Sequence, residues 1–180
     1  GEIRDRETMS AALSYAQSGH LVLATMHASN SYQALTRILS FYPVEVRPSL
    51  LGDLASGLRA VISQRLLRTV NGARVPAVEV LLNTKLVAEL MEQGNFSAVR
   101  DAMVNSIAEG SQTFEAAIAT LVTADPVERA EGMAHADSPT NLLWRLQNDF
   151  MGKNRPTSAT PEVDPDDTPS FTEIVLEVKH

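Results

Sequence analysis

A short apolar run, HLVLATMH, lies between two segments whose apolar residues recur at helical spacing. This run, residues 20–27, is rich in leucine and valine, which predicts a buried strand. Before it, residues 9–16 follow a helical period, and Gly19 is placed to end that helix. After it, residues 34–39 follow the same period until Pro43 stops it. A strand between two helices is the repeating unit of an α/β domain with a parallel sheet.

Two further patterns occur in the middle of the chain. Between Pro48 and Leu67 the apolar residues form one continuous stripe at helical spacing, which predicts a long helix. The members of the stripe are Leu51, Leu54, Leu58, Val61, Ile62 and Leu66. After it, Asn71 and Gly72 lie between two runs of β-type residues, and an Asn-Gly pair in that position predicts a hairpin turn.

Beyond Asn83 the pattern is that of short helices only, separated by glycines and prolines. From Gly152 onward, four of the nine prolines occur with several acids and no apolar period, which predicts a disordered tail. Its end, FTEIVLEV, regains β-type residues and is either loose, a docking strand or a linear motif. We therefore expect an α/β core at 1–83, a helical subdomain at 84–151 and a disordered acidic, proline-rich tail at 152–180.

The composition excludes several classes of protein. Without cysteine, the chain has neither a disulfide framework nor a cysteine-based zinc site. A formal net charge of -7 argues against a protein that coats nucleic acid, because phosphate binding needs a basic face. No apolar run approaches the roughly 18 residues of a membrane-spanning helix, and no stretch resembles a signal peptide. We expect a cytoplasmic protein with no membrane insertion and no nucleic-acid partner.

Glu2 and two histidines are the candidates for chemistry. In a parallel sheet, groups at the carboxyl ends of neighbouring strands collect in one crevice. His27 ends the predicted strand, and Glu2 takes the equivalent place after a strand upstream, while His20 lies at the opposite end. A carboxylate and an imidazole in one crevice suit hydrolysis, because the first orients or deprotonates water and the second contacts phosphate charge. The spacing of the three is not that of a zinc protease, which disfavours a metal site.

Each candidate also has a structural explanation, as a solvated glutamate or as a hydrogen-bonding histidine beside a strand. Nucleotide hydrolysis further needs a phosphate-binding loop. The glycines at the required spacing, Gly52 and Gly57, are followed by Leu58 and Arg59 instead of Lys and Ser or Thr. Either the chain is not an NTPase, or its phosphate-binding loop lies upstream of Gly1.

Three stretches together are similar to the PilT/PilU family of type IV pilus retraction (twitching motility) ATPases. GEIRDRETM resembles its Walker B motif, SGHLVLATMHASNSYQALTRI its His box and LRAVISQRLL the helix that follows. The likeness runs from Gly1 to about Phe150, and GARVPAVEVLLN, GSQTFEAAI and ADSPTNLLWRL match the PilU-like branch better than PilT. The chain is identified as a C-terminal fragment that starts within the Walker B motif and lacks the Walker A loop.

The resemblance implies an α/β fold: the second half of a RecA-like P-loop NTPase core, followed by the helical subdomain. Glu2 resembles the catalytic glutamate, and His20 and His27 resemble the two His-box residues near the γ-phosphate. The full-length protein is expected to be a homo-hexameric motor that hydrolyses ATP with Mg²⁺. Its implied partners are a PilT-type ATPase and the pilus platform protein, at the inner face of the bacterial inner membrane. Thr36 replaces the family's usual acid before Arg37, which alters a local salt bridge.

Two alternatives stay open. Within the class, the chain is a fragment of a PilT or type II secretion ATPase, although the lack of cysteine favours the retraction branch, since the secretion relatives usually carry a tetracysteine element. From another class, it is a non-catalytic interaction module whose helical part and tail bind a partner motor ring. Without a Walker A loop, the fragment alone is expected to be inactive.

Overall fold

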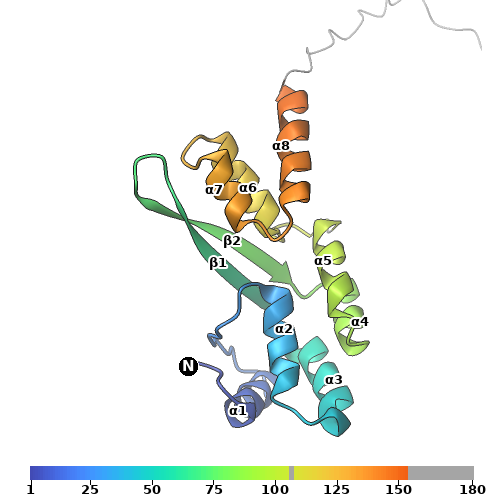
Figure 1. The fold of residues 1–180 in the computed structure, drawn as a ribbon. Coiled ribbons are helices and arrows are strands. Elements are labelled where there is room, and N and C mark those ends of the chain that lie inside the picture. Colours follow the sequence, from blue (N-terminus) through green and yellow to red (C-terminus); the bar gives the residue numbers. More distant parts are fainter. Residues whose placement is uncertain (106–107, 154–180) are drawn as a thin grey trace, which may run out of the picture.

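A two-stranded hairpin forms the centre of the molecule, and helices lie on either side of it (Figure 1). The computed structural model describes residues 1–105 and 108–153. Its elements are, in order, α1 (Arg6–Gln17), α2 (Ser31–Ser40), the 3-10 helix η1 (Val44–Val46), α3 (Arg47–Gly57), β1 (Ala60–Arg68), β2 (Arg74–Leu82), α4 (Lys85–Glu92), α5 (Phe96–Val104), α6 (Phe114–Thr123), α7 (Arg129–His135) and α8 (Pro139–Lys153).

The first two helices begin at side-chain caps. The Asp5 carboxylate accepts a hydrogen bond from the N–H of Thr8 at 2.9 Å, and the two residues form a capping box at the start of α1. The helix ends just before Gly19, whose φ of 91° suits a glycine. Asn30 caps α2, because its side-chain oxygen accepts the N–H of Gln33 at 2.8 Å. Both helices predicted in this region are confirmed.

The run HLVLATMH is not a buried strand. Its sheet contact within the described residues is a parallel bridge between Glu2 and Thr25, and Leu21 and Leu23 are 84% and 79% exposed. A strand alternates its side chains between two faces, and here one face packs, with Met26 against the core of α1–α3. The prediction of burial is wrong because an apolar run indicates strand propensity but not how many neighbours cover it.

The helix predicted between Pro48 and Leu67 is wrong in its second half. The helix α3 ends at Gly57, and the chain becomes extended in β1 from Ala60 onward. There β1 pairs antiparallel with β2 along its whole length. This pairing overrides the helical spacing and splits the stripe between two faces, because Val61 packs against a core whereas Ile62 is 71% exposed.

The Asn71-Gly72 turn between the strands is confirmed. Gly72 has a φ of 81° and donates its N–H to the carbonyl of Thr69 at 2.9 Å. After Leu82, the regular elements of the described chain are helices, as the pattern beyond Asn83 predicts. The FTEIVLEV segment lies outside the described residues. Among the helices that are described, each is too short or too polar to cross a membrane.

The hairpin contributes to two apolar cores. Leu81 on β2 belongs to the core formed with α2, α3, α4 and α5, whereas Leu67 and Ala77 belong to the core formed with α6 and α8. Val87 of α4 lies in the same core as Leu81, so the boundary predicted between residues 83 and 84 runs through shared packing. The division of the chain into three regions stays a prediction.

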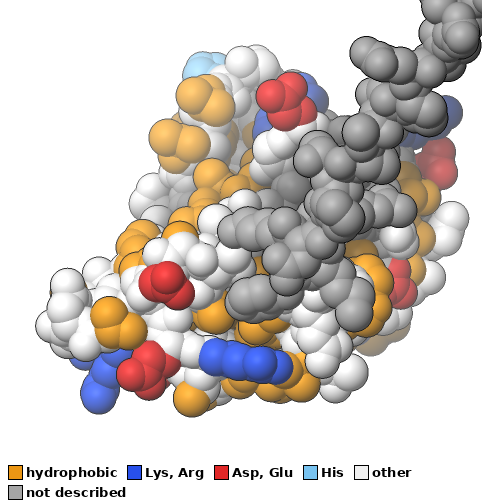
Figure 2. Space-filling view, turned by 90° about the horizontal axis from the view of Figure 1, so that it is seen from above, with side chains coloured by type: hydrophobic (Ala, Val, Ile, Leu, Met, Phe, Trp, Pro, Cys, Tyr) orange, Lys and Arg blue, Asp and Glu red, His pale blue; other side chains and the backbone are white. Residues whose placement is uncertain are grey.

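The molecular surface carries apolar and charged side chains side by side. Figure 2 shows the face seen from above, where hydrophobic side chains are exposed and Lys, Arg, Asp and Glu side chains are dispersed among them. Charged side chains of both signs are present on this face.

Candidate functional site

A parallel backbone bridge brings Glu2 next to His27. The N–H of Ile3 donates to the carbonyl of Thr25 at 2.8 Å, and the N–H of Thr25 donates to the carbonyl of Gly1 at 3.0 Å. His27 follows Thr25 by two residues, and in an extended backbone residues two apart point to the same side. The His27 side chain therefore lies on the side of the bridge that carries the Thr25 side chain. The Nε2 atom of His27 lies 3.1 Å from the Oε1 atom of Glu2. The structure therefore brings these two predicted site residues together.

Arg4 holds the second carboxylate oxygen of Glu2. Its Nε and Nη2 atoms lie 2.8 Å and 2.6 Å from Oε2. This hydrogen bond is the main cause that lowers the pKa of Glu2; burial opposes it, and the charges of Arg4, His27 and Arg37 lower the pKa further. Glu2 is therefore ionised at neutral pH and acts as an acceptor. An ionised carboxylate with one oxygen fixed is suited to orient a water molecule.

His20 is held apart from this pair. Its Nδ1 atom lies 2.9 Å from the hydroxyl of Ser18, and its ring meets the ring of Tyr15 edge to face, with 5.8 Å between centroids. Both partners are local, at the end of α1. Among the described residues, no hydrogen bond or ion pair joins His20 to Glu2 or His27. The structure thus brings together two of the three predicted site residues.

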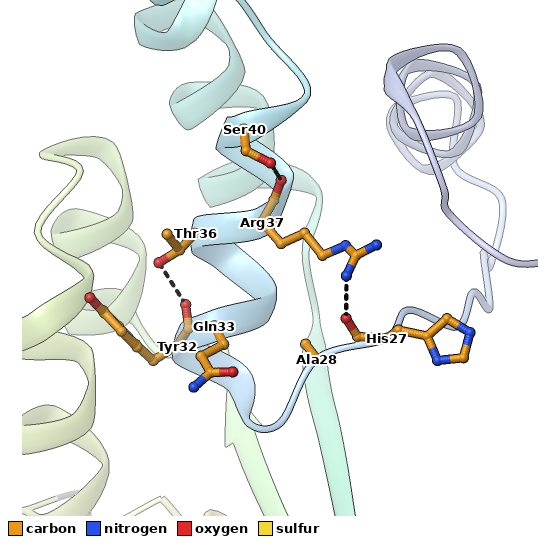
Figure 3. A pocket seen from close by; sticks show the side chains of 7 residues that line it. All are labelled: His27, Ala28, Tyr32, Gln33, Thr36, Arg37 and Ser40. Atoms are coloured by element: carbon orange, nitrogen blue, oxygen red, sulfur yellow. Dashed lines mark hydrogen bonds between the residues drawn. The ribbon is translucent and has the colours of Figure 1, made fainter.

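An open pocket of about 410 Å³ lies between α2 and the His27 loop, which comprises residues 27–30 (Figure 3). Its lining residues are His27, Ala28, Tyr32, Gln33, Thr36, Arg37 and Ser40. Arg37 points toward the loop and donates its Nη1 to the carbonyl of His27 at 2.9 Å, while the His27 ring turns away from α2. Thr36 donates its hydroxyl to the carbonyl of Tyr32 at 3.0 Å, so this position makes a bond within the helix.

Three charged residues that the sequence patterns do not single out hold the His27 loop and the first residue of α2. The bonds are Arg65 Nη2 to the carbonyl of Ser29 at 3.1 Å, Asn30 Nδ2 to Asp137 Oδ2 at 3.0 Å, and the N–H of Ser31 to Glu79 Oε1 at 2.8 Å. Glu79 is buried, and burial raises its pKa. The sequence signal for Arg65 and Glu79 is a charge within an apolar β-type run, because a buried charge must find a partner.

The described groups fit one side of a polyphosphate site. Glu2 and His27 supply a carboxylate and an imidazole, and Arg4 and Arg37 place positive charge beside them. The sequence contains no GxxxxGK[ST] loop that would cradle phosphates with backbone N–H groups. Among the described residues, no group of three or more His, Asp or Glu side chains is placed to hold a metal ion.

Comparison with known proteins defines the class. The chain belongs to the family of type II/IV secretion system proteins, whose model matches residues 1–135. It is 41% identical over 148 residues to the type IV pilus ATPase PilU of Pseudomonas aeruginosa, covering 82% of this chain and 39% of PilU. It is 30% identical over 142 residues to the type IV pilus retraction ATPase PilT of the same organism, covering 79% of this chain and 41% of PilT. The chain spans less than half the length of either relative.

A solved structure supports the same assignment. The crystal structure of the pilus retraction motor PilT with bound ADP has a TM-score of 0.72 and 28% sequence identity with this chain. The match covers 80% of this chain and 40% of that structure. The predicted α/β fold, part of a RecA-like core, is therefore confirmed. The resemblance to the PilT/PilU family is confirmed as well, with PilU the more similar of the two relatives.

Proposed function

We propose that the chain is part of a longer type IV pilus retraction ATPase, which we call the whole protein. In this proposal the chain carries the catalytic glutamate and the phosphate-contacting histidine of the nucleotide site. The observation that carries this proposal is the Glu2–His27 pair at 3.1 Å, set by the parallel bridge inside the matched region. The similarity to PilU favours a motor accessory to a PilT-type ATPase. Its assembly would be a homo-hexamer acting on the pilus platform protein at the inner face of the inner membrane.

Each residue of the pair has a defined task in this proposal. Glu2 orients the attacking water and accepts its proton, and Arg4 keeps the carboxylate ionised and fixed in place. The His27 side chain is 82% exposed beside Glu2, which leaves it open to donate to a γ-phosphate oxygen. His20 is assigned to the site by resemblance, since its contacts in the structure are local. ATP and Mg²⁺ would be held mainly by residues outside this chain.

The test is a Glu2→Gln substitution in the whole protein. The amide keeps the shape and an acceptor oxygen but removes the base, so turnover should fall by roughly 10²-fold or more while ATP binding is retained. Glu7→Gln is the matched control, because it makes the same change in the first turn of α1. Turnover near wild type in Glu2→Gln would refute the catalytic assignment. An inactive wild-type protein that still binds a PilT-type ring would support the interaction-module alternative.

A further inference from the structure

We infer that Asp137, together with Arg65, is a positioning residue that fixes the His27 loop against the hairpin. Neither residue reaches Glu2 or His27 through a bond that the structure describes; both act on the backbone and side chain of the residues that follow His27. The effect on hydrolysis rests on the proposed function above. The anchoring of the loop stands on its own contacts.

Arg65 makes most of the contacts in this loop anchor, by which we mean the contacts of Arg65 and Asp137 with the His27 loop. Its Nη1 donates to the carbonyl of His135 at 2.6 Å, and its Nη2 donates both to the carbonyl of Ser29 and to the carboxylate of Asp137. The guanidinium lies over the ring of Phe114, 4.0 Å from its centroid. Its side chain is 18% exposed, so these partners replace much of its hydration. One side chain thus ties β1, α6, the end of α7 and the His27 loop together.

Asn30 uses both ends of its amide. The Oδ1 atom caps α2 by accepting the N–H of Gln33, and the Nδ2 atom donates to Oδ2 of Asp137. Asp137 therefore binds Arg65 with one oxygen and Asn30 with the other. Because Asn30 follows His27 by three residues, fixing Asn30 restricts where the imidazole lies. Small displacements of a group at a reaction centre are costly, which gives such an anchor a functional effect.

The residue next to Asp137 is itself held by a buried side chain. Glu115 of α6 is buried; it accepts the N–H of Ser138 at 2.8 Å and the Nη2 of Arg100 at 2.7 Å. Glu115 of α6 therefore holds Ser138, the residue next to Asp137. The arrangement is that of a functional group whose supporting residues are themselves held by hydrogen bonds and packing.

Two substitutions weaken the Asn30–Asp137 contact while keeping the cap of α2 and the fold. Asn30→Ser keeps a good N-cap residue for α2 but lacks the amide that reaches Asp137. Asp137→Asn keeps the volume but loses the charge and one acceptor oxygen. The matched control is Glu131→Gln, the same acid-to-amide change in α7, where the carboxylate accepts the N–H of Arg68 on β1 and does not contact the His27 loop. A double substitution of Asn30 and Asp137 should cost no more than the larger single one, since both break the same bond.

The first readout is hydrogen exchange in this 180-residue chain. The N–H groups of Ser31 and Gln33 should exchange about tenfold faster in Asn30→Ser and in Asp137→Asn. This is the effect expected when the start of α2 loses the hydrogen bond from Asn30 to the charged Asp137. Glu131→Gln should leave both groups at the wild-type rate. Unchanged exchange at Ser31 and Gln33 in the two loop variants would overturn the inference, whatever the enzymatic activity of the whole protein.

The second readout is the split between kcat and KM for ATP in the whole protein. Asp137→Asn and Asn30→Ser should lower kcat by about tenfold and leave KM within about twofold, because in the proposed function His27 acts on the γ-phosphate and not on the adenine of ATP. Glu131→Gln should keep wild-type kcat. Faster exchange with unchanged kcat in an active protein would overturn the positioning role. A wild-type protein that equals Glu2→Gln in turnover would instead refute the proposed function and leave the loop anchor, already decided by exchange, in place.

Discussion

His27 and Glu2 lie 3.1 Å apart, yet the His27 side chain is 82% exposed. An ion pair in which one partner is this exposed adds little to the stability of a fold. The exposed position of His27 beside Glu2 is therefore easier to explain by contact with a ligand than by a role in packing. The two explanations differ in what the loss of the imidazole should do.

We expect His27→Ala to leave the melting temperature of the whole protein within about 2 °C of wild type, because no buried contact is lost. Turnover should fall by about 10²-fold or more, since a preorganised donor to the developing phosphate charge is worth about 2.7–4 kcal/mol. Thermal unfolding and steady-state ATPase rates check the two halves. A large drop in melting temperature with normal activity per folded protein would make His27 structural.

The chain by itself should neither bind ATP tightly nor hydrolyse it. The sequence offers no P-loop amides and no accompanying lysine, so the polyphosphate charge lacks a preorganised partner. Isothermal calorimetry with Mg²⁺-ATP should give no micromolar binding. Measurable turnover above that of the Glu2→Gln chain would show that the described residues form a site of their own.

Glu79 should make the stability of the chain depend on pH. Burial raises its pKa in the folded state, so the folded chain binds this proton more tightly than the unfolded chain. The resulting stabilisation is complete below the unfolded pKa of about 4.3 and is lost as pH rises through the folded pKa. Glu79→Gln cannot ionise and keeps an oxygen for the N–H of Ser31.

The free energy of unfolding of the wild type, relative to Glu79→Gln, should accordingly fall as pH rises from about 4 and then level off. Denaturant titrations of the two chains at a series of pH values measure this difference. If the wild type instead gained stability relative to Glu79→Gln over the same pH range, the pKa of Glu79 would be lowered in the folded state. Hydrogen bonding to Ser31 would then outweigh burial.

Two glycines within helices should respond oppositely to alanine. At Gly132 of α7 an added Cβ would lie 2.9 Å from Cγ2 of Val122 and 3.0 Å from Cγ2 of Ile118, whereas at Gly52 of α3 it would meet nothing within 4 Å. Gly52→Ala should stabilise the chain by about 0.5–1 kcal/mol through helix propensity. Gly132→Ala should destabilise it by about 1 kcal/mol, because overpacking outweighs that gain. Equal shifts in both variants would contradict the close packing of α6 on α7.

Local signals in the sequence predicted the elements that depend on local chemistry. The helix end at Gly19 and the turn at Gly72 need only a few neighbouring residues, and both appear where these signals are. Residues 58–67 are different, because their apolar spacing is that of a helix although most of them form the strand β1. Pairing with residues 74–82 decides between the two, and that contact is not encoded in either segment alone.

The candidate site divides in the same way. Glu2 and His27 were predictable, since a motif marks each and a parallel arrangement places both at strand ends. Arg65 and Asp137 were not, because 72 residues separate them along the chain and the helix predicted between Pro48 and Leu67 gives the wrong direction for the Arg65 side chain. Their pairing arises only when α7 packs against β1.

Leu67 and Leu81 lie on paired strands of one hairpin but in different apolar cores. Neither core can lose its strand residues without disturbing the other, because the same ladder of hydrogen bonds holds both. The described chain should therefore melt in a single cooperative transition rather than in two steps. Severing the chain between residues 83 and 84 would leave each piece with an uncovered apolar face, and the two pieces would have to recombine to regain native structure.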